Sequence, residues 1–389
     1  MNYILFDGDS HKTLLPLTFT RPVADIRIGI MTVREKWEYA LKTRTSSLTQ
    51  DYLNKKFPLV VETENILING ALLPNNNLIA EITALKANQA LYQNNHLLAI
   101  NTTQKNFQSL TRIESERIET TSEVILINRS WQIFQLNEKA IRADFEVLTK
   151  ARKSQPISET NKVLGAENIF IEEGAKVECA ILNASTGPIY IGKDAEIMEG
   201  SVIRGPFALC EHSATKLGTK IYGATTIGPY SKVGGEVSNS VVFGYSNKAH
   251  DGFLGNSVLG EWCNLGADTN NSNLKNNYSH VKVWDYATQS YIDTGLQFCG
   301  LVMGDHSKSG INTMFNTGTV VCVCANIFGA GFPEKHIPSF TWGGAGGFTK
   351  YRREEAFEVA ARVYERRGLA LTDADKSILK KTEELDGLS

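Results

Sequence analysis

Cysteine, proline and long apolar runs are all scarce in this chain of 389 residues. The six cysteines form no CxxC pair and no Cys/His spacing of the zinc-binding type. No stretch approaches the ~20 consecutive apolar residues of a membrane span. Residues 1–7 lack the basic segment of a secretory signal and become acidic after one short apolar run. These absences predict a cytoplasmic protein whose thiols are reduced and mostly buried.

An excess of charge of one sign is also lacking. The chain has 40 Lys and Arg residues and 42 Asp and Glu residues, which gives a formal net charge of −2. Nucleic-acid binding usually requires a strongly basic face, so we expect no nucleic-acid partner and no membrane partner. Small phosphorylated ligands remain compatible with this balance, because a few local cations suffice to bind them.

The glycines are distributed unevenly along the chain. Most of the 32 glycines follow residue 164, and a chain of this length exceeds the ~250–300 residues at which single cores stop growing. Both observations predict two main parts. We place the first at residues 1–155, the second at 156–345, and a polar helical tail at 346–389.

The first part alternates strand-like and helix-like segments. The strand-like apolar runs are residues 3–6, 59–61, 66–68, 97–100 and 124–127, and the helix-like spacings are residues 25–41 and 78–92. This alternation predicts an α/β sheet layered by helices. Ligands of such sheets bind beyond the carboxyl ends of the strands, so we expect a site in the turn after the first strand, residues 7–22.

A six-residue repeat runs through the second part. A mostly aliphatic residue recurs every six positions within several blocks separated by slips of the period, and a mostly small side chain follows it four positions later. The recurring residues are Ile191, Ile197, Ile203, Leu209, Ile221, Ile227, Val233, Phe253, Leu259, Leu265, Met303, Ser309, Phe315, Val321 and Ile327. The period fits neither a helix nor a plain strand. It predicts a three-sided parallel β-helix with one short strand on each side.

The repeats and their neighbouring motifs resemble a known enzyme family, the bifunctional UDP-N-acetylglucosamine pyrophosphorylase/glucosamine-1-phosphate N-acetyltransferase family. The similar segments of the second part are 247–255 (NKAHDGFLG), 259–267 (LGEWCNLGA), 273–274 (NL) and 304–312 (GDHSKSGIN). In the first part, 18–22 (TFTRP) and Trp37 resemble a variant branch with a short N-terminal domain. The resemblance implies an α/β nucleotidyltransferase-like (Rossmann-like) domain, a left-handed parallel β-helix of the hexapeptide-repeat acyltransferase superfamily, and a helical tail.

The same resemblance implies an activity and a set of site residues. The family transfers acetyl from acetyl-CoA to the amine of glucosamine 1-phosphate and joins the product to UTP, giving UDP-N-acetylglucosamine. His250 occupies the position of the catalytic base, a task that suits an imidazole near neutral pH. The residues implied for the sugar phosphate are Lys248, Phe253, Asn264, Asn273 and Lys282. Phe253 stands where the family commonly has a tyrosine, so one hydroxyl donor is lost.

Acetyl-CoA and a second copy of the chain are the further partners implied. The residues implied for acetyl-CoA are Ala267, Gly304, Lys308 and Asn312, with a backbone N–H beside Ala267 serving as the oxyanion donor. The resemblance also implies a homotrimer whose flat β-helix sides pack together and share active sites.

The N-terminal part departs from the family pattern. The glycine-rich nucleotide-binding signature is absent, and residues 6–12 (FDGDSHK) stand in its place. Arg21, Arg27 and Lys36 are candidates for nucleotide contacts and Asp7 for Mg²⁺. The arginines are equally compatible with structural ion pairs to nearby aspartates.

Two rival interpretations stay open. In one, the chain is only a sugar-1-phosphate nucleotidyltransferase and its β-helix is a trimerisation module. In the other, the solenoid is a non-catalytic scaffold. The tail after residue 352 is expected to form helices that cap the open end of the solenoid, with a helix start at Thr372.

Overall fold

The computed structural model describes residues 1–103, 107, 110 and 113–387. Contacts within the chain define two compact units. The first comprises Met1–Leu14, Thr20–Ile26 and Met31–Arg129, and the second comprises Leu15–Phe19, Arg27–Ile30 and Ser130–Ser389. Two short N-terminal segments therefore belong to the second unit. The boundaries at residues 155 and 345 remain predictions.

The first unit is built on a six-stranded mixed sheet. Its strands are β1 (Asn2–Phe6), β4 (Ser46–Leu48), β5 (Asn65–Asn69), β6 (Gln89–Gln93), β7 (His96–Thr102) and β8 (Glu116–Glu119), and the unit also contains the short strand β3 (Met31–Thr32), which lies outside this sheet. Its helices are α1 (Ser10–Thr13), η1 (Val23–Asp25), α2 (Val33–Leu41), η2 (Asp51–Leu53) and α3 (Asn76–Thr83). The sheet has the order β4-β1-β5-β7-β6-β8, and β1 pairs in parallel with both β4 and β5. The predicted α/β class is confirmed.

Several predicted elements of this unit differ from the structure. The helix expected at 25–41 begins only at Val33, where Thr32 and Glu35 form a capping box. The helix expected at 78–92 ends at Thr83, and the chain continues as strand β6. The runs 59–61 and 124–127 form no strand, apart from an isolated bridge at Leu126.

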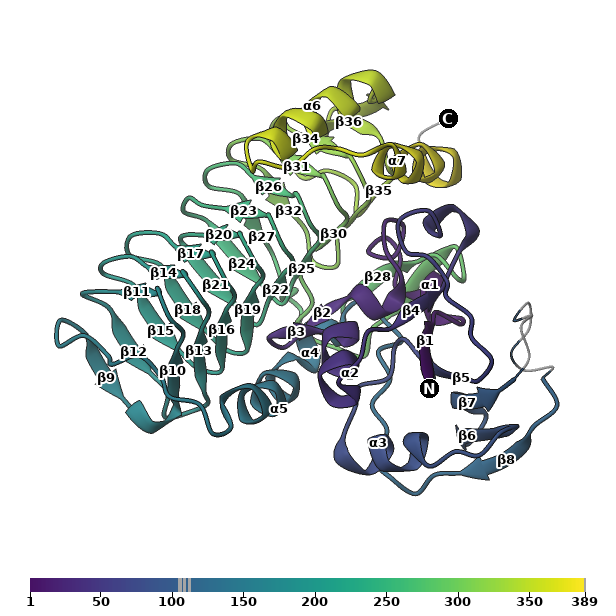
Figure 1. Ribbon diagram of the computed structural model, residues 1–389. Coiled ribbons are helices and arrows are strands. Elements are labelled where there is room, and N and C mark those ends of the chain that lie inside the picture. Colours follow the sequence, from purple (N-terminus) through teal and green to yellow (C-terminus); the bar gives the residue numbers. More distant parts are fainter. Residues whose placement is uncertain (104–106, 108–109, 111–112, 388–389) are drawn as a thin grey trace. The chain divides into compact units, whose positions relative to one another are not determined.

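The second unit is a parallel β-solenoid with three faces, whose strands lie in stacked rows (Figure 1). Face 1 contains β10 (Ile169–Ile171), β13 (Ile189–Ile191), β16 (Phe207–Leu209), β19 (Thr225–Ile227), β22 (Val241–Val242), β25 (Val258–Leu259), β30 (Val302–Met303), β33 (Val320–Val321) and β35 (His336–Ile337). Face 2 contains β11 (Lys176–Val177), β14 (Glu196–Ile197), β17 (Ala214–Thr215), β20 (Lys232–Val233), β23 (Asn247–Lys248), β26 (Asn264–Leu265), β31 (Lys308–Ser309), β34 (Asn326–Ile327), β36 (Thr341–Gly344) and the antiparallel β37 (Gly347–Lys350).

Face 3 completes the coils. It contains β9 (Lys162–Leu164), β12 (Ile181–Asn183), β15 (Val202–Arg204), β18 (Lys220–Tyr222), β21 (Glu236–Ser238), β24 (Phe253–Gly255) and, beyond them, the pair β27 (Asn270–Asn271) and β32 (Met314–Phe315). A hairpin of β28 (Lys282–Asp285) and β29 (Ser290–Asp293) interrupts the repeat. The predicted fold class, an α/β domain followed by a hexapeptide-repeat β-helix and a helical tail, is confirmed.

The interior of the solenoid explains the six-residue repeat. Ile191 pairs with Leu209, which pairs with Ile227, and all three side chains are fully buried. Each coil therefore stacks an aliphatic side chain on its copy in the next coil. The structure corrects one member of the predicted row, because Leu254 pairs with the buried Val237 while Phe253 pairs with Glu236. The inward residue after Val242 is thus Lys248, followed six positions later by Leu254.

Two helices and the short N-terminal segments pack on this solenoid. The additional elements are β2 (Arg27–Ile28), α4 (Gln132–Gln135), α5 (Asn137–Thr149) and η4 (Ala166–Asn168). Ile30 and Ile141 join a buried cluster with Phe170 and Tyr190 of face 1. Phe19 joins another buried cluster that includes Phe340 and Tyr351.

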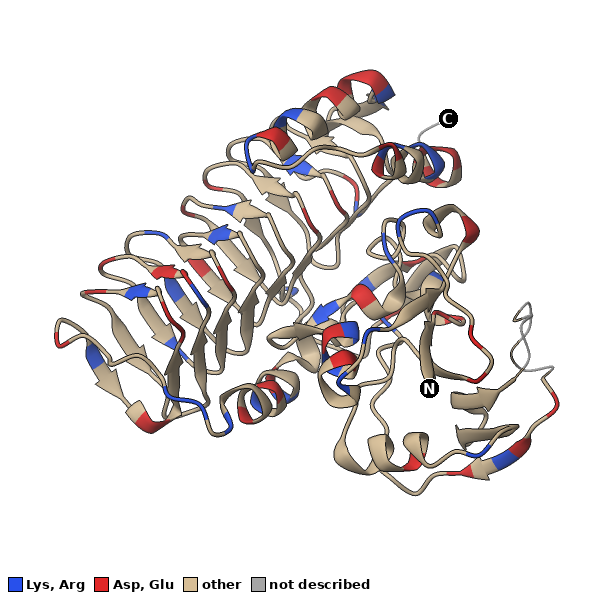
Figure 2. Ribbon diagram, viewed as in Figure 1, with Lys and Arg blue, Asp and Glu red and all other residues tan. Residues whose placement is uncertain are grey.

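The tail forms the two expected helices, α6 (Arg353–Glu365) and α7 (Asp373–Asp386), and Thr372 is the N-cap of α7, as the predicted helix start requires. Acidic and basic residues are interspersed along both (Figure 2). Helix α6 also covers a side of the solenoid, because the Tyr364 ring stacks on Trp262 with centroids 4.0 Å apart. No helix in the described part of the chain is long and apolar enough to cross a membrane.

Candidate functional site

His250 lies at an exposed corner of the solenoid between strands β23 and β24. Its imidazole has no hydrogen-bond or ion-pair partner among the residues that the structure describes. The preceding inward residue, Lys248, and the following one, Leu254, are six positions apart, so the corner has regular length. No irregular loop therefore lifts His250 off the core. A regular corner presents the ring to solvent.

Lys248 occupies the interior row of face 2, directly after Val233. Its side chain is 1% exposed, and its Nζ donates hydrogen bonds to the backbone oxygens of Gly234 (3.0 Å) and His250 (2.8 Å). Burial lowers the pKa of Lys248 from its usual 10.5 to about 8, although Asp251 and Asp268 partly oppose the shift. The ammonium group is hydrogen-bonded to the backbone of the corner. Its bond to the His250 oxygen holds the backbone of His250 in place.

Phe253, Asn256 and Asn273 meet on the outer side of face 3. Asn273 Nδ2 donates to Asn256 Oδ1 at 2.8 Å. Gly255 makes this arrangement possible, because a Cβ there would lie 2.4 Å from Phe253 Cζ and 2.7 Å from Asn273 Nδ2. The amide cluster and the aromatic ring form a polar and apolar surface of the kind that sugars contact.

The residues expected to bind acetyl-CoA lie mainly on the next coils. Ala267 is at the same corner as His250 one coil later, and the Asn312 N–H donates to the Ala267 oxygen at 2.9 Å. Asn264 and Lys308 are paired in register on face 2, and Lys308 Nζ donates to the His306 oxygen at 2.8 Å. Burial lowers the pKa of Lys308. Ala267 and Asn312 therefore lie on the corner of His250, whereas the amine of Lys308 bonds to the corner between faces 1 and 2.

Two expected residues lie elsewhere. Gly304 is at the opposite end of β31, at the corner between faces 1 and 2, where its backbone packs on Cys322. Lys282 is exposed on the β28–β29 hairpin, opposite Asp293. The structure does not bring either residue into the group around His250.

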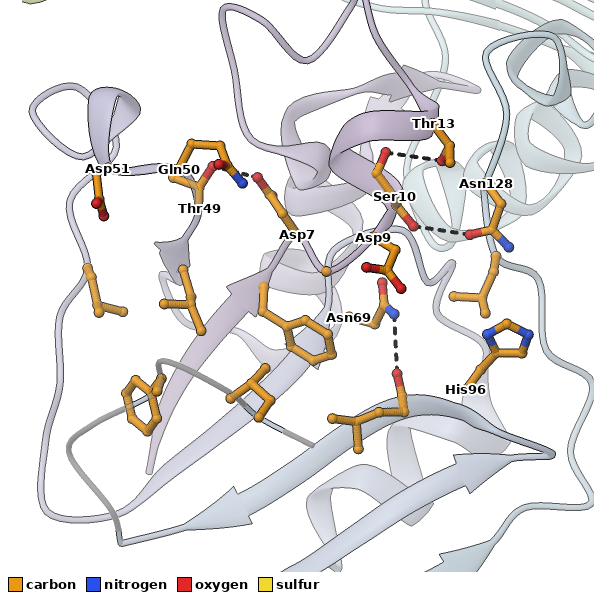
Figure 3. Close-up of a pocket in the computed structure, with 18 of the residues that line it drawn as sticks. Asp7, Asp9, Ser10, Thr13, Thr49, Gln50, Asp51, Asn69, His96 and Asn128 are labelled. Carbon is orange, nitrogen blue, oxygen red and sulfur yellow. Dashed lines mark hydrogen bonds between the residues drawn. The ribbon is translucent and has the colours of Figure 1, made fainter. Parts of the chain in front are cut away.

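A cavity of about 1020 Å³ lies in the first unit, beyond the ends of β1, β4 and β5 (Figure 3). This is the place that the α/β pattern predicts for a ligand. The polar residues that line it are Asp7, Asp9, Ser10, Thr13, Thr49, Gln50, Asp51, Asn54, Asn69, Asn95, His96, Asn128 and Arg129. Five side-chain amides in this set suit hydroxyls and base edges, which both donate and accept hydrogen bonds.

The candidates for nucleotide contacts are placed differently. The side chains of Arg21, Arg27 and Lys36 are buried, and none is among the described residues that line the cavity. Arg27 belongs to the second unit, where its Nη1 donates to the Ile30 oxygen. A role of these three residues in nucleotide binding, or of the arginines in ion pairs, stays a prediction.

Asp7 is buried and its carboxylate is already engaged. Val23 N–H donates to Oδ1 at 2.8 Å, while the Thr49 hydroxyl and the His11 ring (3.0 Å) contact Oδ2. These contacts engage part of the carboxylate, and the role of Asp7 as a Mg²⁺ ligand stays a prediction. Asp9 and Asp51 are exposed at the cavity. Sequence reasoning missed them, although each follows a strand of the sheet within three residues, which is the usable signal.

Comparison with known proteins agrees with the two-unit organisation. The family model described as sugar nucleotidyl transferase matches residues 3–153, which contain every described residue of the cavity. The match supports the expected nucleotidyltransferase-type N-terminal part.

Three relatives are acetyltransferases or bifunctional proteins. An uncharacterized acetyltransferase YaiX of Escherichia coli is 25% identical over 164 residues, 42% of this chain and 70% of the relative. A bifunctional sugar-1-phosphate nucleotidylyltransferase/acetyltransferase of Sulfurisphaera tokodaii is 28% identical over 144 residues, 36% of this chain and 35% of the relative. The bifunctional protein GlmU of Methanocaldococcus jannaschii is 33% identical over 86 residues, 22% of this chain and 20% of the relative. The family model and these relatives together indicate an enzyme of the transferase class.

Solved structures of acyltransferases also match the chain. The UDP-N-acetylglucosamine acyltransferase from Campylobacter jejuni has a TM-score of 0.26 and 12% identity, covering 58% of this chain and 95% of that chain. AntD, an N-acyltransferase from Bacillus cereus, has a TM-score of 0.22 and 10% identity, covering 54% and 91%. TM-scores this low support no conclusion about this chain.

Proposed function

We propose that the chain is a two-part sugar-phosphate transferase. The solenoid acetylates the amine of glucosamine 1-phosphate with acetyl-CoA, and the α/β unit joins the N-acetylglucosamine 1-phosphate product to UTP. The observation that carries the acetyltransferase proposal is the exposed, unpartnered imidazole of His250 at a corner whose backbone Lys248 anchors. The bifunctional relative from Sulfurisphaera tokodaii supports the combination of activities.

The chemistry assigns a separate task to each group at the corner. The amine nitrogen attacks the thioester carbon, and His250 takes the proton that the nitrogen loses. The resulting oxyanion needs a fixed donor, for which a backbone N–H at the Ala267 corner is suited. Collapse of the intermediate expels the thiolate of CoA, which accepts a proton to leave as free thiol.

The neighbouring side chains would bind the two substrates. Asn264 and Asn273 offer amides to the sugar hydroxyls, and Phe253 offers a ring face. Lys308 and Asn312 lie one coil further along, where acetyl-CoA would extend. A homotrimer would let a neighbouring solenoid complete this groove.

The cavity of the α/β unit suits the second reaction. A phosphate oxygen of the sugar 1-phosphate attacks the α-phosphorus of UTP and pyrophosphate leaves, so the negative charge around the reacting phosphates must be neutralised. Among the described lining residues the only Lys or Arg is Arg129. Asp9 and Asp51 are the residues that would hold Mg²⁺, which supplies the missing positive charge when bound.

One observation favours the alternative in which only the nucleotidyltransferase is active. The sugar-phosphate site of the solenoid needs a cation, yet Lys248 is committed to backbone oxygens and Lys282 is on the separate hairpin. In that case the solenoid would be a trimerisation module.

A pair of assays separates these functions. The purified chain is mixed with acetyl-CoA and glucosamine 1-phosphate while free thiol is followed, and then with UTP, Mg²⁺ and N-acetylglucosamine 1-phosphate while pyrophosphate is followed. We expect both products, and we expect His250→Ala to slow thiol release by about 10²–10⁴-fold without affecting pyrophosphate release.

His212→Ala is the matched control, because His212 is another half-exposed histidine at a corner of the same solenoid. It should leave both rates unchanged. Thiol release that survives His250→Ala would remove the assignment of the base. Pyrophosphate without any thiol release would establish the alternative.

A further inference from the structure

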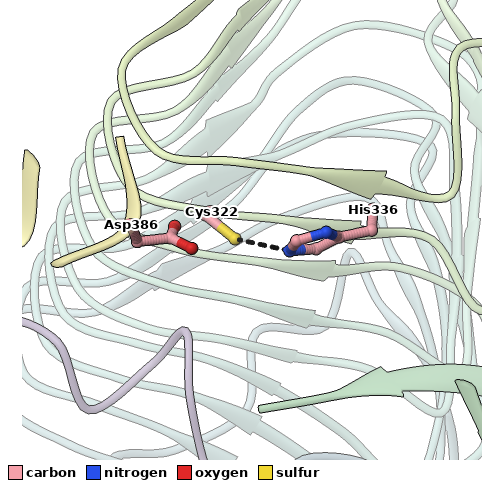
Figure 4. A group of neighbouring side chains, drawn as sticks. All are labelled: Cys322, His336 and Asp386. Atoms are coloured by element: carbon pink, nitrogen blue, oxygen red, sulfur yellow. Dashed lines mark hydrogen bonds between the residues drawn. The ribbon is translucent and has the colours of Figure 1, made fainter. Parts of the chain in front are cut away.

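Three ligand-type side chains from distant parts of the second unit converge near the end of the solenoid (Figure 4). Cys322 follows strand β33, His336 is in strand β35, and Asp386 is the last residue of helix α7. One ligand atom from each residue lies within 4.8 Å of the others. Neither the predicted activities nor the cavity of the first unit uses this group.

The separations suit a tetrahedral metal ion. Cys322 Sγ and His336 Nε2 are 3.8 Å apart. Typical Zn–S and Zn–N bonds at a tetrahedral angle place the two ligand atoms about 3.6 Å apart. A thiolate, an imidazole and a carboxylate from separate chain segments are the donor types that zinc prefers in proteins.

The charges also point to a divalent cation. Among the described residues no Lys or Arg forms an ion pair with Asp386, although the carboxylate is only half-exposed. A thiolate at Cys322 together with the Asp386 carboxylate carries two negative charges. One Zn²⁺ balances them.

The surrounding groups orient the ligands. Ser339 donates to Asp386 Oδ2 from its N–H (2.9 Å) and from its hydroxyl (2.6 Å). The ring of His336 stacks on Trp284 with centroids 4.4 Å apart, which fixes the direction of Nε2. Hydrogen bonds and packing of this kind commonly hold metal ligands in place.

Tyr286 is the fourth member of the group. Its hydroxyl donates to Asp386 Oδ1 at 2.8 Å and lies 2.6 Å from Cys322 Sγ and 3.2 Å from His336 Nε2. A tyrosine hydroxyl is a neutral phenol near neutral pH. A neutral hydroxyl adds no charge to the cluster and is free to be displaced from its centre.

We propose that Cys322, His336 and Asp386 bind a zinc ion that ties helix α7 to the last coils of the solenoid. The Tyr286 hydroxyl then contributes the fourth ligand or a hydrogen bond to Asp386. Binding deprotonates the Cys322 thiol and releases that proton to solvent. The site is separate from the groups around His250 and the cavity at Asp9, so it is structural rather than catalytic.

The test uses the full chain without a histidine tag, grown with added zinc and dialysed before elemental analysis. We expect about one zinc per chain, and replacement by Co²⁺ should give the absorption band of a thiolate–cobalt bond. A chelator should lower the melting temperature of the wild-type chain. Cys322→Ser should lose the zinc, the cobalt band and the effect of the chelator.

Cys324→Ser is the matched control, because Cys324 is an equally buried cysteine two residues away that is outside the group. It should keep all three properties. Asp386→Asn, at the end of the last helix, tests the site in a chain whose solenoid is intact. A wild-type chain with less than about 0.1 zinc, or a cobalt band that survives Cys322→Ser, would overturn the proposal and leave a metal-free hydrogen-bonded group.

Discussion

At the scale of single residues, Lys248 has the most unusual environment in the solenoid. It stands in a row of inward side chains that is otherwise aliphatic or small, next to Val233. A charged group in such a place requires hydrogen-bond partners, and the oxygens of Gly234 and His250 supply them. The same two bonds connect the interior of the coil to the corner that carries the proposed base.

The lowered pKa of Lys248 predicts a pH dependence of stability. Below about pH 8 the amine is protonated in both the folded and the unfolded chain. Between about pH 8 and its usual 10.5 only the unfolded chain binds the proton, so this residue makes the folded state more stable as the pH rises. The free energy of unfolding of wild type, relative to Lys248→Met, should therefore rise by about 1–3 kcal/mol between pH 7 and pH 10.

Urea unfolding of both chains at several pH values measures this difference. Lys220→Met serves as the control, because Lys220 is an exposed lysine on strand β18 of the same solenoid. The difference in unfolding free energy between Lys220→Met and wild type should stay constant over the same pH range. If the difference in unfolding free energy between Lys248→Met and wild type were also independent of pH, the Lys248 amine would be exposed to water in the folded protein.

Residue-scale features were only partly predictable. The sequence placed His250 in a distinctive motif, but the six-residue pattern was traced through aliphatic residues and so missed a lysine in the row. The lining of the α/β cavity was missed for a different reason. Asp9, Asp51 and Asn128 come from separate loops, and their convergence depends on the sheet order rather than on any local motif.

At the scale of elements, the stacked interior rows should dominate the stability of the solenoid. Leu259 is 0% exposed and pairs with Val242 on one side and Met303 on the other. Truncation there leaves a cavity that the flanking coils do not fill, so Leu259→Ala should cost about 2–5 kcal/mol of unfolding free energy.

The same substitution at a corner gives a direct comparison. Leu217 is 69% exposed, and Leu217→Ala should change the unfolding free energy by less than about 0.5 kcal/mol. Both values come from thermal or urea unfolding followed by circular dichroism. Similar losses at the two positions would contradict the assignment of Leu259 to the interior row.

The failed helix prediction at 25–41 also has an element-scale cause. The apolar spacing continues through Ile26 and Ile30, but the backbone there bonds to side chains far along the chain. Gly29 N–H donates to Asn137 at 2.7 Å and Ile30 N–H donates to Asp144 at 2.8 Å. Gly29 also has a φ of +72°, and a Cβ there would lie 2.5 Å from Asp144 Oδ2. These partners are more than 100 residues away, so no local pattern reveals them.

At the scale of the whole molecule, chain order and folding units do not coincide. Phe19 is close to the N-terminus, yet it belongs to the second unit and packs with Phe340 and Tyr351 near the C-terminus. Its ring also meets Tyr286 edge to face, with centroids 5.5 Å apart. The six-residue repeat predicted the solenoid itself, but it gave no indication that Phe19 packs against the last coils.

Hydrogen exchange tests this contribution. In Phe19→Ala, the amides of Phe340 and Tyr351, which bond to Val323 and Phe340 respectively, should exchange faster because their packing is loosened. The amide of Gly192, which bonds to Leu209 in an early coil, is the internal reference and should be unaffected. Equal acceleration at all three sites would indicate global destabilisation instead.

The position of Phe19 has a consequence for how the protein is made. Phe19 leaves the ribosome more than 330 residues before Tyr351. At a usual elongation rate of ~5–20 residues per second, the early segment waits roughly 15–65 s for its partners. During that interval its apolar side chains are open to solvent or chaperones. The last coils therefore finish folding only when Phe19 and Tyr351 have both been synthesised.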